Sequence, residues 1–143
     1  MSKTTTAHAA SDLRFVTLDE SGEIAYFHSD SQSKPGTVNV TALDLATEDT
    51  FCFCKAAECG HTCWHVVYVA AAWRMVAHRV RCQQMTMAEL VAHGQSLVKY
   101  VQDAERDGHD WLAANFRQQL DEARVVWQER RAAQVAPAEL VAA

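Results

Sequence analysis

Four of the five cysteines of the chain and two of its seven histidines fall between Cys52 and His65. This segment, FCFCKAAECGHTCWH from residue 51, constrains the fold most, because clustered thiols hold a metal, form disulfides or do redox work. The polar N-terminus MSKTTTAHAASD has no apolar stretch typical of a signal peptide. We therefore expect a cytoplasmic protein, in which structural disulfides are rare and clustered cysteines more often bind metal.

The spacing of the cysteines selects one set of ligands. Cys52-x-Cys54 is followed, after eight residues, by Cys63-x-His65. Residues two apart on a strand point to the same side, so a strand ending here presents both thiols of the first pair. The second pair falls at the start of a helix. Three thiolates and one imidazole complete the tetrahedral shell that Zn²⁺ adopts in structural sites, so the sequence predicts a structural Zn²⁺ ion held by these four residues.

Other uses of the ligands stay open. Cys59 and His61 lie between the two pairs, and an alternative set in which Cys59 replaces Cys63 is compatible with the spacing. A redox dithiol at Cys52 and Cys54 needs an exposed thiolate of low pKa and leaves the second pair unexplained. No residues for an oxyanion site indicate a cysteine hydrolase, so we expect no enzyme activity. We interpret Cys82 as a core residue, and three further histidines as surface or helix-end residues: His78, His93 and His109.

The chain before the cysteines has the alternation and turn residues of a small antiparallel sheet. A loop of Ser, Pro and Gly separates the strands at residues 29–36, and Ser21-Gly22 makes a turn. The expected strands are residues 13–18, 24–28, 38–45 and 50–54.

The chain after Cys63 has the three- and four-residue spacing of helices. The first helix is expected to end near residues 82–84. Thr86 and Glu89 form a capping box that opens a second helix, which Asp107-Gly108 ends. A third helix begins at Asp110, and the two form an antiparallel hairpin. The sequence therefore predicts an α+β fold: a flexible leader (1–12), a zinc-binding unit with strands (13–85), a helical hairpin (86–135) and a tail that frays near Pro137 (136–143).

The cysteine segment resembles the SWIM-type zinc finger. The resemblance covers about residues 24–80 and includes Cys52, Cys54, Cys63 and His65, the apolar run Val66–Ala70, and the preceding strand and Pro-Gly loop. It implies a small zinc-supported ββα unit that binds DNA or proteins and has no catalytic role. The chain departs from the family at Lys55-Ala56-Ala57, where a proline is common, and at Trp64, where a basic residue is common. Trp64 is expected to cover the zinc site, with stacking on a base or partner as the alternative.

Charge is unevenly distributed in this acidic chain of net charge −5. Residues 51–82 contain four basic residues against Glu58 alone, so an anionic partner is expected to dock there. A DNA-binding accessory subunit or regulator is the first functional hypothesis. The alternative is a protein-interaction adaptor that uses the C-terminal helices, through which the chain also self-associates, and has no DNA affinity. Neither hypothesis includes a membrane or a small-molecule substrate. The expected nucleic-acid contacts are Lys55, Arg74, Arg79 and Arg81.

Overall fold

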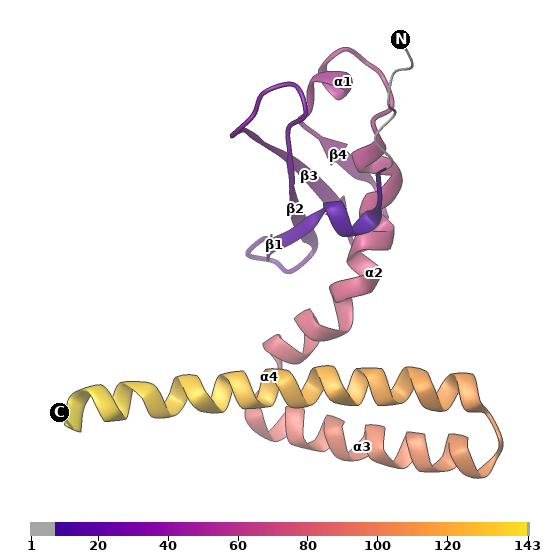
Figure 1. Ribbon diagram of the computed structural model, residues 1–143, viewed down its shortest axis with the longest axis vertical. Coiled ribbons are helices and arrows are strands. Elements are labelled where there is room, and N and C mark those ends of the chain that lie inside the picture. The colour runs from indigo at the N-terminus through magenta and orange to yellow at the C-terminus, as the bar shows by residue number, and fades with distance from the viewer. Residues whose placement is uncertain (1–7, 143) are drawn as a thin grey trace. The chain divides into compact units, whose positions relative to one another are not determined.

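The fold is α+β, as the sequence predicts, with a four-stranded antiparallel sheet followed by helices (Figure 1). The computed structural model describes the backbone of residues 8–142 and the side chains of residues 8–135. The strands pair in chain order, β1-β2-β3-β4. The elements are η1 (Ala10–Asp12), β1 (Arg14–Leu18), β2 (Ile24–Asp30), β3 (Val38–Asp44), β4 (Thr50–Cys52), α1 (Lys55–Glu58), α2 (Trp64–Gln84), α3 (Met87–Arg106) and α4 (Asp110–Ala142).

Two compact units make up the chain, and each has its own core. They divide between Val76 and Ala77, within α2. From the sequence we expect the boundary after residue 85, at the end of this helix; the observed boundary lies within the helix. The last turns of α2 belong to the second unit because Cys82 packs with apolar residues of α3 and α4.

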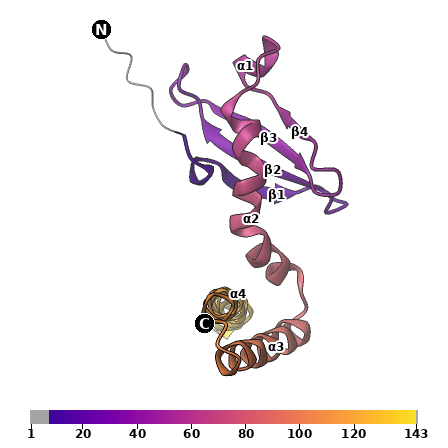
Figure 2. The ribbon, with the colours of Figure 1, turned by 90° about the vertical axis from the view of Figure 1, so that its right-hand side faces the viewer.

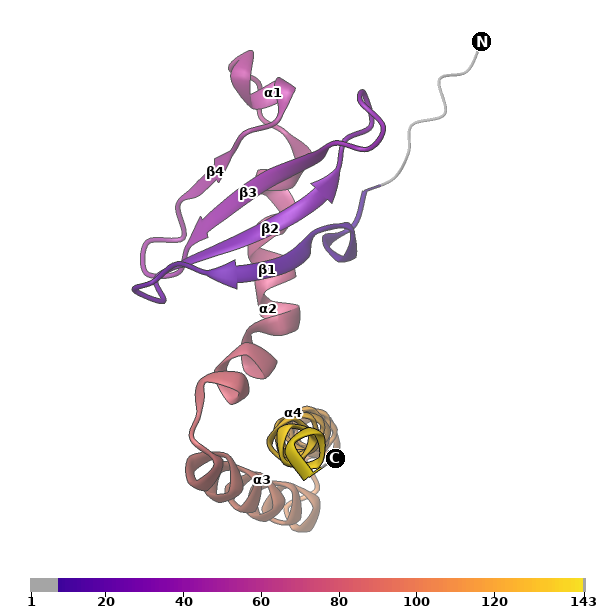
Figure 3. The same cartoon turned by 90° about the vertical axis from the view of Figure 1, so that its left-hand side faces the viewer.

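In the first unit the sheet packs against the first half of α2. Figure 3 shows the sheet with α2 behind it, and Figure 2 shows α2 crossing the same face from the front. Alternate residues of β2 are buried, which is the pattern of a strand with one covered face. Phe27 of β2 and Leu43 of β3 pack with Val69 and Ala72 of α2 in this core.

The turn between β1 and β2 is held by one carboxylate. Asp19 Oδ1 accepts hydrogen bonds from the backbone N–H groups of Glu23 and Ile24, at 2.8 and 2.9 Å. Gly22 has a φ of 75°, a left-handed conformation that glycine adopts without strain. The hydrogen bonds from Ile24 and from the Ser21 hydroxyl lower the pKa of Asp19, because they favour its charged form.

The expected flexible leader lies partly outside the described residues, since residues 1–7 are not among them. Residues 8–12 are ordered by local contacts. Asp12 closes a short turn by accepting a hydrogen bond from the backbone of Ala9 at 2.9 Å. The ring of His8 stacks on Trp64 of α2, with centroids 4.1 Å apart. This part of the leader is therefore folded against the first unit.

The second unit contains the expected helical hairpin. Figure 1 shows α3 and α4 side by side and running in opposite directions. Thr86 caps α3, because its hydroxyl accepts a hydrogen bond from the backbone N–H of Glu89 at 3.1 Å. Gly108, with φ of 75°, lies in the short connection between the helices. The core of this unit contains Cys82, Leu90, Leu97, Ala123 and Val126.

The C-terminal tail differs from the sequence-based expectation. We expect fraying near Pro137, but α4 continues through this residue to Ala142. None of the helices in the described part of the chain has a stretch long and apolar enough to cross a lipid bilayer.

Candidate metal centre

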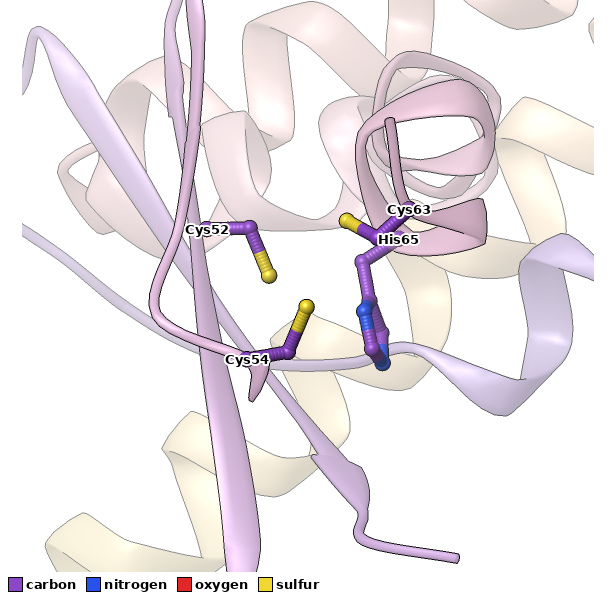
Figure 4. Close-up of side chains that lie close together, drawn as sticks. All are labelled: Cys52, Cys54, Cys63 and His65. Carbon is purple, nitrogen blue, oxygen red and sulfur yellow. The ribbon is translucent and has the colours of Figure 1, made fainter. Parts of the chain in front are cut away.

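The four ligands selected from the sequence come together in the first unit. Figure 4 shows Cys52 and Cys54 on one side and Cys63 and His65 on the other, with their side chains turned toward one another. One ligand atom from each residue lies within 4.8 Å of the others. Cys54, Cys63 and His65 are buried, and Cys52 is half-buried. These side chains form a candidate metal centre, since together they can hold a metal ion.

The two pairs approach each other because a tight turn separates them. β4 ends at Cys52, and Cys54 is the N-cap of the short helix α1. The strand is thus two residues shorter than expected, and the segment between the two ligand pairs contains a helical turn. Gly60 ends this turn at a φ of 76°, while the backbone N–H groups of Gly60 and His61 donate to the carbonyls of Ala57 and Ala56. This Schellman motif returns the chain toward the first pair of cysteines.

The imidazole of His65 is the group of this centre that most clearly lacks hydrogen-bond partners among the described residues. Both of its ring nitrogens are buried and neither has a hydrogen-bond partner among the described residues. Burial, followed by the nearby charge of His8, lowers the pKa of His65 and favours the neutral ring. A buried polar group without a partner costs roughly 1–3 kcal/mol. A metal ion bound to one nitrogen offsets that cost, so the residues present fit a metal.

The thiols of the first pair have different environments. Burial raises the pKa of Cys52 to about 11, even though the Thr41 hydroxyl, 3.5 Å from its sulfur, favours the thiolate. Burial also acts to raise the pKa of Cys54, but the backbone N–H groups of Ala57 and Ala56 and the neighbouring thiols outweigh it and lower the pKa. Cys54 is therefore the easier thiol to ionise. The raised pKa of Cys52 disfavours its use as a free redox nucleophile.

Three further residues lie between the ligands in the sequence: Cys59 and His61 between the two pairs, and Trp64 between Cys63 and His65. Trp64 is half-buried between His8 and His65, and its ring centroid lies 4.1 Å from that of His65. This agrees with the expected covering role. Cys59 and His61 are exposed and lie outside the group of four. The alternative set with Cys59 in place of Cys63 therefore requires the turn to rearrange.

The four basic residues expected to contact nucleic acid are all exposed. Lys55 and Arg74 belong to the first unit, and Arg79 and Arg81 to the second. Arg79 forms an ion pair with Glu129 at 3.0 Å, which neutralises part of the expected basic surface. No carboxylate of the described residues lies within 4 Å of Lys55, Arg74 or Arg81.

A second group of ligands was missed from the sequence. His78, Cys82 and His93 converge in the second unit. Cys82 is a core residue, as we expect, but His78 and His93, expected as surface or helix-end residues, are half-buried against it. The signal present in the sequence was His78-x₃-Cys82, a four-residue spacing that puts both side chains on one helix face. His93 follows on another helix, and only the packing of the two helices brings it close.

The chain was compared with protein-family models, with curated proteins and with solved structures. None of the three comparisons gave a match.

Proposed function

We propose that the chain is a zinc-supported binding module of the SWIM type. The observation that carries this proposal is the convergence of three thiols with a buried histidine whose ring nitrogens have no hydrogen-bond partner among residues 8–135. Thiolate and imidazole together favour Zn²⁺ over hard cations such as Mg²⁺ or Ca²⁺. The ion would be held by Cys52, Cys54, Cys63 and His65. A bound Zn²⁺ would supply folding energy by joining the end of β4 to the start of α2.

The proposed role is not enzymatic. Catalytic zinc sites commonly keep one coordination position open for water or substrate. Four protein ligands fill a tetrahedral shell and leave no such position. We therefore assign the zinc site a structural role. The proposed binding function belongs to the protein surface whose fold the zinc site stabilises.

DNA is the first proposed ligand of this module. Each unit contributes exposed basic residues that have no carboxylate within 4 Å in the described part of the chain: Lys55 and Arg74 in the first unit, and Arg81 in the second. Guanidinium groups pair well with phosphate oxygens, and a partner bound through a few such contacts is sensitive to salt. Phe51 and Phe53, with 55% and 68% of their surfaces exposed, flank Cys52 and offer rings on which unpaired bases can stack.

Two measurements on the full chain test this proposal. Metal analysis after purification without added zinc is expected to find zinc, and Cys54→Ser to remove one equivalent. Binding to mixed-sequence DNA is expected to weaken with salt, with a slope of log affinity against log salt of about −2 to −3 for three phosphate contacts. Reversal of Arg74 and Arg81 to Glu removes this binding. The charge-matched control is Lys99→Glu with Arg124→Glu, both exposed residues of the hairpin.

These outcomes separate the parts of the proposal. Absence of zinc from the four-ligand site overturns the module itself. Zinc without DNA binding, or equal loss of binding in the control variant, removes DNA as the ligand and leaves the module standing.

A protein-interaction adaptor is the second candidate function. It is favoured by the Arg79–Glu129 ion pair, which reduces the free basic surface. It is also favoured by the apolar side chains that the helical hairpin leaves exposed; Trp111, for example, has 78% of its surface accessible. The large exposed apolar residues on α3 and α4 are Val91, Val98, Tyr100, Trp111, Leu112, Val125 and Val135.

Analytical ultracentrifugation tests the adaptor function through self-association. The chain is expected to form an oligomer that Trp111→Ala with Leu112→Ala weakens. Val67→Ala, at an exposed apolar residue of the first unit, serves as the control and leaves the oligomer intact. A monomer at all concentrations, together with DNA binding, decides for the first candidate.

A further inference from the structure

The second group of possible metal ligands comes from two helices of the second unit, and a third helix supplies a residue that contacts it. His78 and Cys82 lie one turn apart on α2, His93 lies on α3, and Glu122 lies on α4. Cys82 is fully buried within the hairpin core, and the two histidines are half-buried. The ligand atoms of the three residues lie within 4.8 Å of one another.

Of the two distances from Nε2 of His78, the one to sulfur is close to that around a metal ion, and the one to nitrogen is shorter. The Nε2 atom of His78 lies 2.9 Å from Nε2 of His93 and 3.6 Å from the sulfur of Cys82. A tetrahedral ion with bonds of about 2.0–2.1 Å to nitrogen and 2.3 Å to sulfur separates two nitrogens by about 3.4 Å and nitrogen from sulfur by about 3.5 Å. The nitrogen–sulfur distance already matches. A small rotation of either imidazole opens the nitrogen–nitrogen distance.

Glu122 orients one of the ligands. Its Oε2 atom lies 2.8 Å from Nδ1 of His78. An ionised carboxylate only accepts hydrogen bonds, so it favours the tautomer with the proton on Nδ1. The lone pair of Nε2 is then directed at His93 and Cys82. Metal-binding histidines usually have such a carboxylate or carbonyl behind them, because it sets the tautomer and raises the basicity of the ring.

A hydrogen bond between the two histidines explains only part of this arrangement. If His93 donates to Nε2 of His78, the one lone pair of that nitrogen is taken, and the Cys82 thiol 3.6 Å away has no second lone pair there to donate to. Burial lowers the pKa of His93 and raises the pKa of Cys82, so both side chains are neutral in the hydrogen-bonded arrangement.

We propose that His78, Cys82 and His93 form a second metal site, with Glu122 as the residue that positions His78. Two imidazoles and one thiolate suit Zn²⁺ and other borderline transition metals and exclude Mg²⁺ and Ca²⁺. Three protein ligands leave the fourth position of a tetrahedral ion to water or an incoming ligand. The site joins α2 to α3 and does not depend on the four-ligand site of the first unit.

Cobalt titration of the full chain tests this site, because Co²⁺ occupies zinc sites and gives visible and charge-transfer absorption. The wild-type chain is expected to bind two equivalents. A Cys54→Ser/Cys63→Ser variant retains one equivalent, with the weaker charge-transfer band of a site that has one thiolate. Adding Cys82→Ala and His93→Asn to that variant removes this equivalent. His109→Asn, at an exposed histidine of the hairpin connection, is the matched control and changes nothing.

A conservative variant distinguishes loss of metal binding from loss of the fold. Glu122→Gln keeps the shape of the side chain and removes its charge, and we expect about 10–100-fold weaker cobalt binding with the charge-transfer band retained. Helical circular dichroism shows that each variant is folded. Two results overturn the proposal: no cobalt bound by the Cys54→Ser/Cys63→Ser variant, or binding that survives the loss of Cys82 and His93. Unchanged affinity in Glu122→Gln overturns the positioning role.

Discussion

The two ligand groups of this chain are built in opposite ways. The group around Cys54 comes from residues within one strand–turn–helix segment, and its buried histidine has no hydrogen-bond partner in the described part of the chain. The group around Cys82 comes from separate helices, and His78 already has partners on both ring nitrogens. An ion bound at the first site would therefore satisfy its polar atoms. The second retains a hydrogen-bonded arrangement without an ion, supported by the apolar core of the hairpin.

The largest expected effect is a difference between the two units in how far their stability depends on bound metal. Cys54→Ser removes a direct ligand, so zinc affinity at the first site should fall by more than the roughly 10–100-fold that loss of a supporting residue costs. Hydrogen exchange is expected to speed up across residues 52–65 and to stay slow in α3 and α4. Equal loss of protection in both units contradicts the comparison.

Removing core volume from the hairpin is expected to destabilise the second unit and to leave the first unit unchanged. Leu97 is almost fully buried, and Leu97→Ala is expected to destabilise the second unit by about 2–5 kcal/mol. Denaturant unfolding followed by helical circular dichroism measures this loss. Cobalt binding at the four-ligand site is expected to be unchanged. If that site weakens as well, the two units do not have independent cores.

A smaller effect is expected at the start of α3. Thr86→Ala removes the side-chain cap and leaves the backbone N–H of Glu89 without its acceptor, which costs about 1 kcal/mol. Thr86→Ser keeps the hydroxyl and is the control. Denaturant unfolding of the two variants gives the difference, and equal stability would mean that the cap does not support the hairpin.

The smallest effect concerns the turn of the first unit. The lowered pKa of Asp19 means that its hydrogen bonds stabilise the folded state above the ordinary value of 3.8 and lose this contribution as pH falls through the folded pKa. Carboxyl chemical shifts followed from neutral to acidic pH are expected to give Asp19 a lower midpoint than 3.8. A midpoint at or above this value shows that the turn does not depend on the charge.

The features of the fold that could be predicted from the sequence are those encoded by local patterns of residues. Alternation predicted the four strands, and Thr86 with Asp107-Gly108 predicted the bounds of α3, because these signals act within a few residues. The group from Cys52 to His65 was predicted for the same reason. Helix α1 was missed, since four residues carry too little periodicity to distinguish a helical turn from a loop.

Long-range packing accounts for what the sequence did not reveal. His93 joins His78 and Cys82 only because α2 and α3 pack together, and no spacing along the chain encodes that contact. The ion pair of Arg79 with Glu129 links residues 50 positions apart, so the basic segment looked freer than it is. The extension of α4 through Pro137 was also missed, because proline normally indicates the end of a helix.

The Schellman turn at Gly60 has a consequence for how the first site captures an ion. Only eight residues separate Cys54 from Cys63, and the turn already fixes several of their torsion angles. The entropy lost on closing a loop grows with the number of free residues, so little remains to be lost when the ligands close around a metal. If the site binds a metal ion as proposed, the turn holds the ligands near their bound positions beforehand, and the entropy cost of closing the site around the ion is small.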